Sequence, residues 1–182
     1  MISVMSSKLI DLLQAREGRE LALGAGAFLF QAGDLVTTLF VVLDGEMRLV
    51  RHSEDGGVIV LQRARPEMVL AEASLFSDRY HCDAVAAVAA RLKGMPVGGL
   101  RQAFRTEPAF AEAWAGHLAR EVQGARFRVE VGALRTVAAR LDAWLGWQDG
   151  VPPRKGEWKQ VAQQIGVSAE ALYRELSRRR RL

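Results

Sequence analysis

The spacing of apolar positions changes along this chain. Between residues 21 and 96, apolar residues form short runs separated by turn-forming residues. The run Thr37–Leu43 is rich in β-branched and aromatic side chains, and the Asp44-Gly45 pair that follows it favours a tight hairpin turn. Further runs occupy residues 47–52, 58–61, 68–71 and 84–90. Short strands at this spacing predict an antiparallel barrel or sandwich rather than a parallel sheet with crossover helices.

After Pro96 the apolar positions repeat with the period of a helix. We expect a short helix over 97–104 and a long one over 107–132. A globular domain rarely needs so long a helix for its own core, so we expect this helix to pair two copies of the chain. Its apolar seam, with one member at every fourth position, is Phe110, Trp114, Leu118 and Val122. Two shorter helices, interrupted near Gly124 or Gly132, are the alternative.

The segment Trp158–Leu176 predicts two helices joined by a tight turn. Gly166 suits a helix C-terminus with positive φ, and Ser168 suits an N-cap whose oxygen bonds the amide of Glu170 or Ala171. Inward-facing apolar residues lie on both sides of the turn: Val161, Ile165, Val167, Leu172 and Leu176. This pattern is typical of a helix-turn-helix. Residues 133–147 predict a further amphipathic helix before it.

The composition is that of an ordinary globular protein. Of 182 residues, 49% are hydrophobic and 25% are charged, and no apolar run reaches the ~18 residues of a membrane span. The first residues lack the positive and long apolar regions of a secretion signal, so we expect a cytoplasmic protein without membrane partners. A single cysteine, Cys82, excludes an intrachain disulfide and any four-thiolate zinc or iron–sulfur site.

The charge is concentrated near the end of the sequence. Residues 154–182 contain eight basic and three acidic residues, whereas residues 1–153 contain 17 basic and 18 acidic residues. A basic end that includes a helix-turn-helix predicts binding to double-stranded DNA through a recognition helix over 168–180. Base contacts are expected from Ser168, Ala169, Glu170, Tyr173 and Arg174, with Arg174 suited to guanine and Glu170 to cytosine. Phosphate contacts are expected from Lys159, Arg178, Arg179, Arg180 and Arg181.

Two other classes of protein were weighed against this interpretation. A cupin-like enzyme needs clustered metal ligands, but His52, His81 and His117 are scattered along the sequence. No nucleophile–base pair, phosphate loop or paired carboxylates stand out, so we predict no catalytic residue and no metal site. The second class is a ligand-binding or protein-interaction module whose basic end binds DNA without sequence preference; steep salt dependence of binding favours the DNA-binding regulator.

Four segments carry a family pattern: Phe30–Asp34 (FQAGD), Leu43–Leu49 (LDGEMRL), Ala71–Phe76 (AEASLF) and Val167–Arg174 (VSAEALYR). In this order they resemble the cyclic-AMP receptor protein/Fnr (Crp/Fnr) family of bacterial transcription regulators. The resemblance covers residues 20–180 and implies an α+β fold. Its first part, expected over 1–106, is an antiparallel β-roll of the cyclic-nucleotide-binding jelly-roll type with flanking short helices. A long dimerisation helix is expected over 107–132, and an all-α helix-turn-helix domain over 133–182.

The same resemblance implies a function. A homodimeric, sequence-specific transcription regulator is expected, which binds a near-palindromic site with half-sites about 34 Å apart. Double-stranded DNA, a second copy of the chain and RNA polymerase are its expected partners. Control by an unidentified effector in the β-roll is part of this expectation.

Three features depart from the family pattern. Family members that bind cyclic nucleotides have a glycine before the glutamate and an Arg-Ser/Thr pair about ten residues later, where this sequence has Ala71 and His81-Cys82. Without that arginine the cyclic phosphate loses a bidentate partner, so we expect that cyclic AMP does not bind tightly. The oxygen-sensing branch needs four cysteines, which excludes its iron–sulfur cluster here. Finally, where the family has a β-hairpin wing, the sequence ends in the arginine run 178–181, which we expect to make the phosphate contacts of the wing.

What remains of an effector pocket is Glu72, His81 and Cys82. A histidine beside a cysteine can ligate haem, or the cysteine can be oxidised. A single histidine and a single cysteine in a β-roll are, however, more often structural. An unidentified effector, or none, is therefore favoured over haem. No cofactor is predicted.

Overall fold

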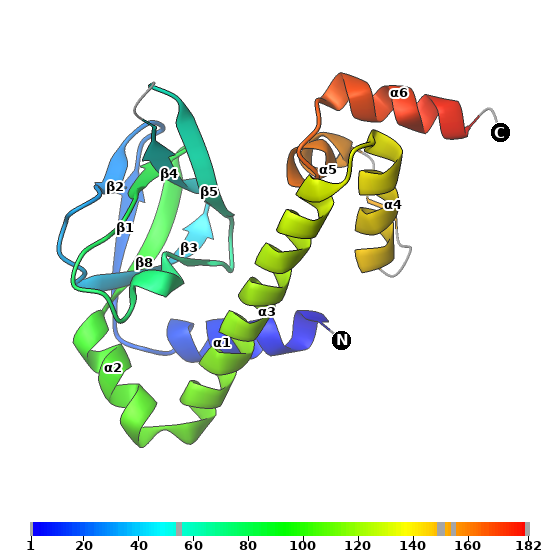
Figure 1. Ribbon diagram of the computed structural model, residues 1–182. Coiled ribbons are helices and arrows are strands. Elements are labelled where there is room, and N and C mark those ends of the chain that lie inside the picture. Colours follow the sequence, from blue (N-terminus) through cyan, green and yellow to red (C-terminus); the bar gives the residue numbers. More distant parts are fainter. Residues whose placement is uncertain (1, 54–55, 149–151, 154–155, 181–182) are drawn as a thin grey trace. The chain divides into compact units, whose positions relative to one another are not determined.

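The computed structural model describes residues 2–53, 56–148, 152–153 and 156–180 (Figure 1). The chain forms two compact units, one up to His117 and one from Leu118 on. The boundary lies inside a single helix, α3 (Pro108–Ala133). The three-part domain division expected from the family resemblance stays a prediction.

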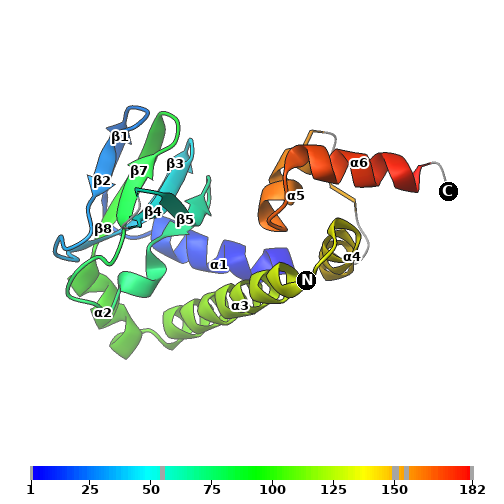
Figure 2. The ribbon, with the colours of Figure 1, turned by 45° about the horizontal axis from the view of Figure 1, so that its top comes forward.

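The first unit contains a β-roll of two antiparallel sheets, each of four strands within the described residues (Figures 1 and 2). The sheet orders are β1-β8-β3-β6 and β2-β7-β4-β5. The strands are β1 (Arg19–Leu23), β2 (Phe28–Phe30), β3 (Thr38–Asp44), β4 (Met47–His52), β5 (Val58–Ala64), β6 (Val69–Leu70), β7 (Asp83–Ala86) and β8 (Ala90–Pro96). Alternate side chains of both sheets, among them Met47, Leu70 and Leu92, meet in one apolar core. The predicted antiparallel β-roll and the α+β class are confirmed.

The turn at Asp44-Gly45 differs from the prediction. β3 pairs with β6 and β8, whereas β4 pairs with β5 and β7, so the two strands lie in different sheets and form no hairpin. Only Gly45 of the pair has a positive φ, 83°. A Cβ at this glycine would lie 2.2 Å from the carbonyl oxygen of Ala89. Glycine is therefore needed where the chain passes from one sheet to the other, because a neighbouring strand connection leaves no room.

The apolar run at 84–90 is also divided differently. It contains the end of β7, a turn and only the first residue of β8. β8 is a central strand that pairs with both β1 and β3, and it was missed because Arg91, Lys93 and Gly94 weaken its apolar pattern. Short helices were expected to flank the roll, but the bounds of the N-terminal helix α1 (Ile2–Gln14) were not predicted; Leu9 and Leu13 on it are fully buried.

The helices after the roll follow the predicted order. α2 (Val97–Thr106) leads to α3, which continues past Gly124 to Ala133, so the alternative of two shorter helices is wrong. α4 (Val137–Trp147) begins four residues later than predicted, because the Thr136 hydroxyl accepts a hydrogen bond from the Ala139 amide and caps it there. α5 (Trp158–Gln164) and α6 (Ala169–Arg179) complete the second unit. In the described part of the chain, no helix is both long and apolar enough to cross a membrane.

Candidate nucleic-acid interface

The turn between α5 and α6 has the local geometry predicted from the sequence. Gly166 has a φ of 66°, and the Ser168 hydroxyl accepts a hydrogen bond from the Ala171 amide at 3.1 Å. Both features end one helix and begin the next within four residues. Beneath the turn, Val161, Ile165 and Leu172 are buried in the core of the second unit. The helix-turn-helix geometry therefore rests on a local signal and a shared apolar core.

The first turns of α6 present polar side chains to solvent. Ser168, Glu170, Tyr173 and Arg174 are exposed, and Ala169 is half-buried. The backbone amide of Glu170 and the Ser168 hydroxyl hold the pKa of the Glu170 carboxyl below 4.5, and Lys159 and Arg174 lower it further. The carboxylate is thus charged at neutral pH and has two cations in its field. Four of the five residues predicted to contact bases are thus exposed, and their contact with DNA stays a prediction.

The residues predicted to contact phosphates fall into three groups. Lys159 and Arg180 are exposed. Arg178 and Arg179 both donate to the carboxylate of Glu175, and these hydrogen bonds lower the pKa of that carboxyl to about 2. Arg181 lies outside the described residues.

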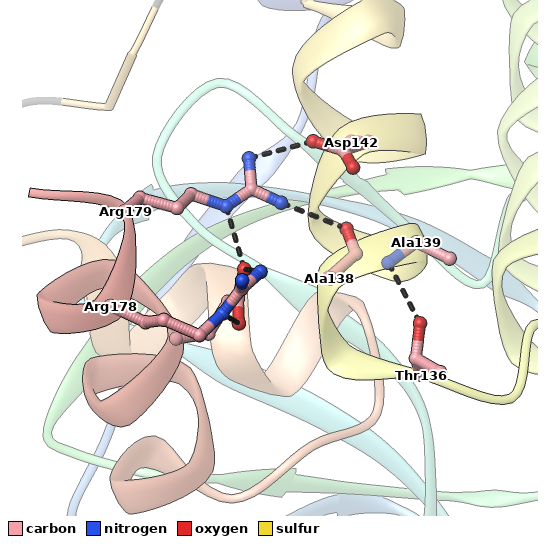
Figure 3. Close-up of polar contacts among 7 residues, drawn as sticks. Thr136, Ala138, Ala139, Asp142, Arg178 and Arg179 are labelled. Carbon is pink, nitrogen blue, oxygen red and sulfur yellow. Dashed lines mark hydrogen bonds and ion pairs between the residues drawn. The ribbon is translucent and has the colours of Figure 1, made fainter. Parts of the chain in front are cut away.

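Arg179 is the clearest departure among them. Its guanidinium points at α4, where it donates to the Asp142 carboxylate at 2.6 Å and to the carbonyl oxygen of Ala138 at 3.1 Å (Figure 3). A third bond to Glu175 occupies its Nε. Each of the three guanidinium nitrogens therefore has a protein acceptor, and Arg179 joins α6 to α4 instead of standing free for a phosphate.

Arg140 on α4 has a structural role that the sequence reasoning missed. Its guanidinium donates to four carbonyl oxygens at 2.8–3.0 Å: Gly132, Leu134, Ile165 and Gly166. It thereby satisfies carbonyls at the C-terminal ends of both α3 and α5, the latter within the turn before α6. A signal existed in the sequence, because Arg140 interrupts the buried face of α4 between Val137 and Trp144.

The predicted dimer seam on α3 needs correction. Phe110 and Trp114 are fully buried within the first unit, where both rings pack edge-on against Phe104. They are therefore not available to a second copy of the chain. Leu118 is half-buried and Val122 is 48% exposed, and both belong to a second stripe that is described below.

Of the three residues of the expected effector pocket, Glu72 and His81 contact polar side chains of the roll, whereas Cys82 lies in its core. The Ser74 hydroxyl lies 3.4 Å from Nδ1 of His81, and the Gln62 amide donates to the Glu72 carboxylate at 3.1 Å. Cys82, however, is buried in the core of the roll, and this burial raises the pKa of its thiol. It faces the core rather than an open site. The sequence reasoning also missed Arg51 of β4, whose guanidinium lies 3.5 Å from the carbonyl oxygen of His81.

Ala71 keeps a conformation that normally favours glycine. It has φ 58° and ψ 36°, in the left-handed region, directly before the short 3₁₀ helix Glu72–Ser74. The position corresponds to the family glycine named above. The turn is therefore retained although a methyl group now occupies it.

No metal centre is formed by the described residues: no three His, Cys, Asp or Glu side chains lie close enough together to hold an ion. The three histidines have different neighbours. His52 lies 3.1 Å from the Asp83 carboxylate, His81 contacts Ser74, and His117 packs against Trp114.

Comparison with known proteins identifies the first unit. Residues 20–107 match the model of the cyclic nucleotide-binding domain. These residues are similar to that domain family. The match covers the β-roll from Glu20 on and α2, and it includes Glu72 and His81. A comparison with curated proteins found no match.

Solved structures share the fold over nearly the whole chain. FixK2 from Bradyrhizobium japonicum is 17% identical over 90% of this chain and 84% of its own, with a TM-score of 0.66. The c-di-GMP-responsive global regulator CLP from Xanthomonas campestris is 18% identical over 97% and 90%, with a TM-score of 0.61. The catabolite activator protein of Thermus thermophilus is 22% identical over 96% and 82%, with a TM-score of 0.53. The chain therefore shares the fold of these proteins, as expected from its resemblance to the Crp/Fnr family.

Proposed function

We propose that this protein is a homodimeric transcription regulator that binds DNA in a sequence-specific manner. The observation that carries the proposal is the capped helix α6, whose exposed first turns combine Glu170, Tyr173 and Arg174 above a buried helix-turn-helix core. The fold shared with FixK2, CLP and the catabolite activator protein supports it. Neither feature requires an enzymatic activity.

Two side chains of α6 are proposed to read bases. Arg174 donates two parallel hydrogen bonds to O6 and N7 of guanine, and Glu170 accepts one from N4 of cytosine. They are four residues apart and therefore lie on one face of the helix. Lys159 and Arg180 contact phosphates, whereas Arg178 and Arg179 are held by Glu175 and contribute less than the sequence alone predicts.

The proposed dimer seam on α3 keeps Leu118 and Val122 of the predicted seam but continues towards the end of the helix instead of its start. Leu118, Val122, Ala125, Val129 and Gly132 follow one another at alternating steps of four and three residues, which is the heptad spacing of a coiled coil. Four of them are exposed, Val129 by 75%. Phe127 and Val131, on the opposite side of the helix, pack into the core of the second unit. The seam residues are thus apolar positions of α3 that do not belong to the core of the second unit.

Cyclic AMP is not the proposed effector. Ala71 places a methyl group where the family has a glycine, and His81-Cys82 replace the Arg-Ser/Thr pair, with Cys82 turned into the core. Calorimetric titration with cyclic AMP should therefore give no micromolar binding. A micromolar affinity would overturn this part of the proposal.

The proposal is tested by selecting bound duplexes from a random library at physiological salt. We expect enrichment of a two-fold symmetric motif with half-sites about one helical turn apart. Arg174→Ala should relax the preference at one base position, whereas Arg180→Ala should weaken binding to all sequences and reduce the salt dependence. Weak binding without any motif, equal for both variants, would contradict the proposal and favour a module with a non-specific basic end.

A further inference from the structure

A groove lies at the end of the β-roll where the chain enters β1 and leaves β8. Its volume is about 490 Å³, and it lies on the face of the sheet that carries Leu21 and Phe40. Arg19, Thr38 and Pro96 form its walls, together with Glu17 from the segment before β1. Because Glu72, His81 and Cys82 are not among the residues that line it, the groove is distinct from the effector site discussed above.

A glycine, which has no side chain, keeps the floor of the groove open. Gly94 lies beside Phe40 in the β3–β8 pair. A Cβ at Gly94 would lie 3.0 Å from both the Phe40 ring and the Thr38 methyl group. Any larger residue there would therefore cover the aromatic floor. The groove itself, at about 490 Å³, leaves room for a bulky apolar group.

Two side chains of opposite charge line the groove, and neither forms an ion pair within the described residues. Glu17 and Arg19 are exposed, and neither has an ion pair or a side-chain hydrogen bond within the described residues. Nearby charges of the same types are paired: Arg16 with Glu107, and Arg91 with Glu20. An anion alone would be repelled by Glu17 and a cation alone by Arg19. A molecule that bears both charges satisfies both side chains.

We propose that this groove binds an α-amino acid with a bulky apolar side chain. Arg19 receives the carboxylate through charge-assisted hydrogen bonds, and Glu17 receives the ammonium group. Leu21, Phe40 and Pro96 contact the apolar side chain of the amino acid. A pocket of this size with an apolar floor and a few polar groups is typical of small-molecule sites.

The experiment is a calorimetric titration of the full-length chain with L-phenylalanine. Binding is expected below about 1 mM, with glycine, phenylacetate and phenethylamine each at least about tenfold weaker, because each lacks the apolar group or one charge. Absence of binding by phenylalanine up to about 10 mM would overturn the proposal. Equal binding of phenylacetate or phenethylamine would overturn the role of the paired charges.

Variants test whether phenylalanine binds in the groove or elsewhere on the roll. Arg19→Met and Glu17→Gln should each weaken phenylalanine binding about tenfold. Glu20→Gln on β1 and Arg91→Met on the paired strand β8 are the matched controls, because both side chains lie on the opposite face of the sheet from Arg19. All four positions are exposed, so the variants should melt near the temperature of the unmodified chain. Equal affinity in Arg19→Met and Arg91→Met would contradict the site. No DNA is present, so failure here is independent of the proposed regulator function.

Discussion

Arg140 holds the helix-turn-helix together through carbonyl groups that would otherwise be unpaired. Replacement by Met keeps the length of the side chain but removes its donors to four carbonyl oxygens. We expect Arg140→Met to lower the free energy of unfolding by about 2–4 kcal/mol, since bonds from a charged donor are lost together. Urea unfolding measures the loss. Arg135→Met, at an exposed position just before α4, is the control and should change stability little. Equal losses in both variants would argue against this role.

Tyr80 links the stability of the roll to alkaline pH. Its hydroxyl donates to the carbonyl oxygen of Thr38, its ring stacks on Phe30, and burial raises its pKa from 10.0 to about 12. A raised pKa means that the folded state holds the proton more tightly. The contribution is therefore complete below pH 10 and is lost as the pH rises from 10 towards 12.

The unmodified chain should accordingly lose about 1 kcal/mol more stability between pH 9 and 11 than Tyr80→Phe, which cannot ionise. Urea unfolding of both proteins across this range gives the difference, in which the titration of all other groups cancels. A parallel decline of the two curves would show that Tyr80 does not carry the effect.

Ser168 caps the start of α6. Ser168→Ala removes the acceptor for the Ala171 amide and should cost about 1 kcal/mol of stability, measured by thermal or urea unfolding. Because fraying of the first turn displaces Glu170 and Arg174, DNA affinity should fall as well. Ser177→Ala, at an exposed position later in α6, is the matched control. A cap variant with unchanged stability would show that core packing alone sets the helix start.

α3 contributes side chains to the buried parts of both units. Its Phe110 and Trp114 belong to the aromatic cluster of the first unit, whereas Phe127 and Val131 belong to the core of the second. The stripe from Leu118 to Gly132 is the part of α3 that we propose contacts a second copy of the chain. The helix as an element was predicted from its period, but its free face was not, because the period does not reveal which apolar residues the chain itself buries.

Dimer formation through the seam of α3 is part of the proposed function. Val129→Asp places a charge on the proposed seam and should shift the protein from dimer to monomer in sedimentation at micromolar concentration. Affinity for a symmetric DNA site should fall with it, because one copy then contacts one half-site. Gln123→Asp, an exposed position off the seam, should leave both properties unchanged. A monomeric unmodified chain, or a dimeric Val129→Asp variant, would exclude this seam.

The sequence by itself determined the features that depend on neighbours a few residues apart. The glycine turn at Gly166, the Ser168 cap, the long helix and the order of strands followed by helices all have this local origin. Backbone conformation, capping bonds and apolar period act over three or four residues, so a sequence pattern is enough to predict them.

The tertiary structure decided everything that depends on distant partners. It separated β3 from β4 into two sheets, buried Cys82 and Trp114, and joined Arg179 to Asp142. It also brought Glu17 and Arg19 beside Phe40. Strand pairing, core membership and ion pairs are settled by which surfaces meet once the chain is folded. The physical reason is that a side chain's burial and charge partner belong to the packed neighbourhood rather than to its place in the sequence.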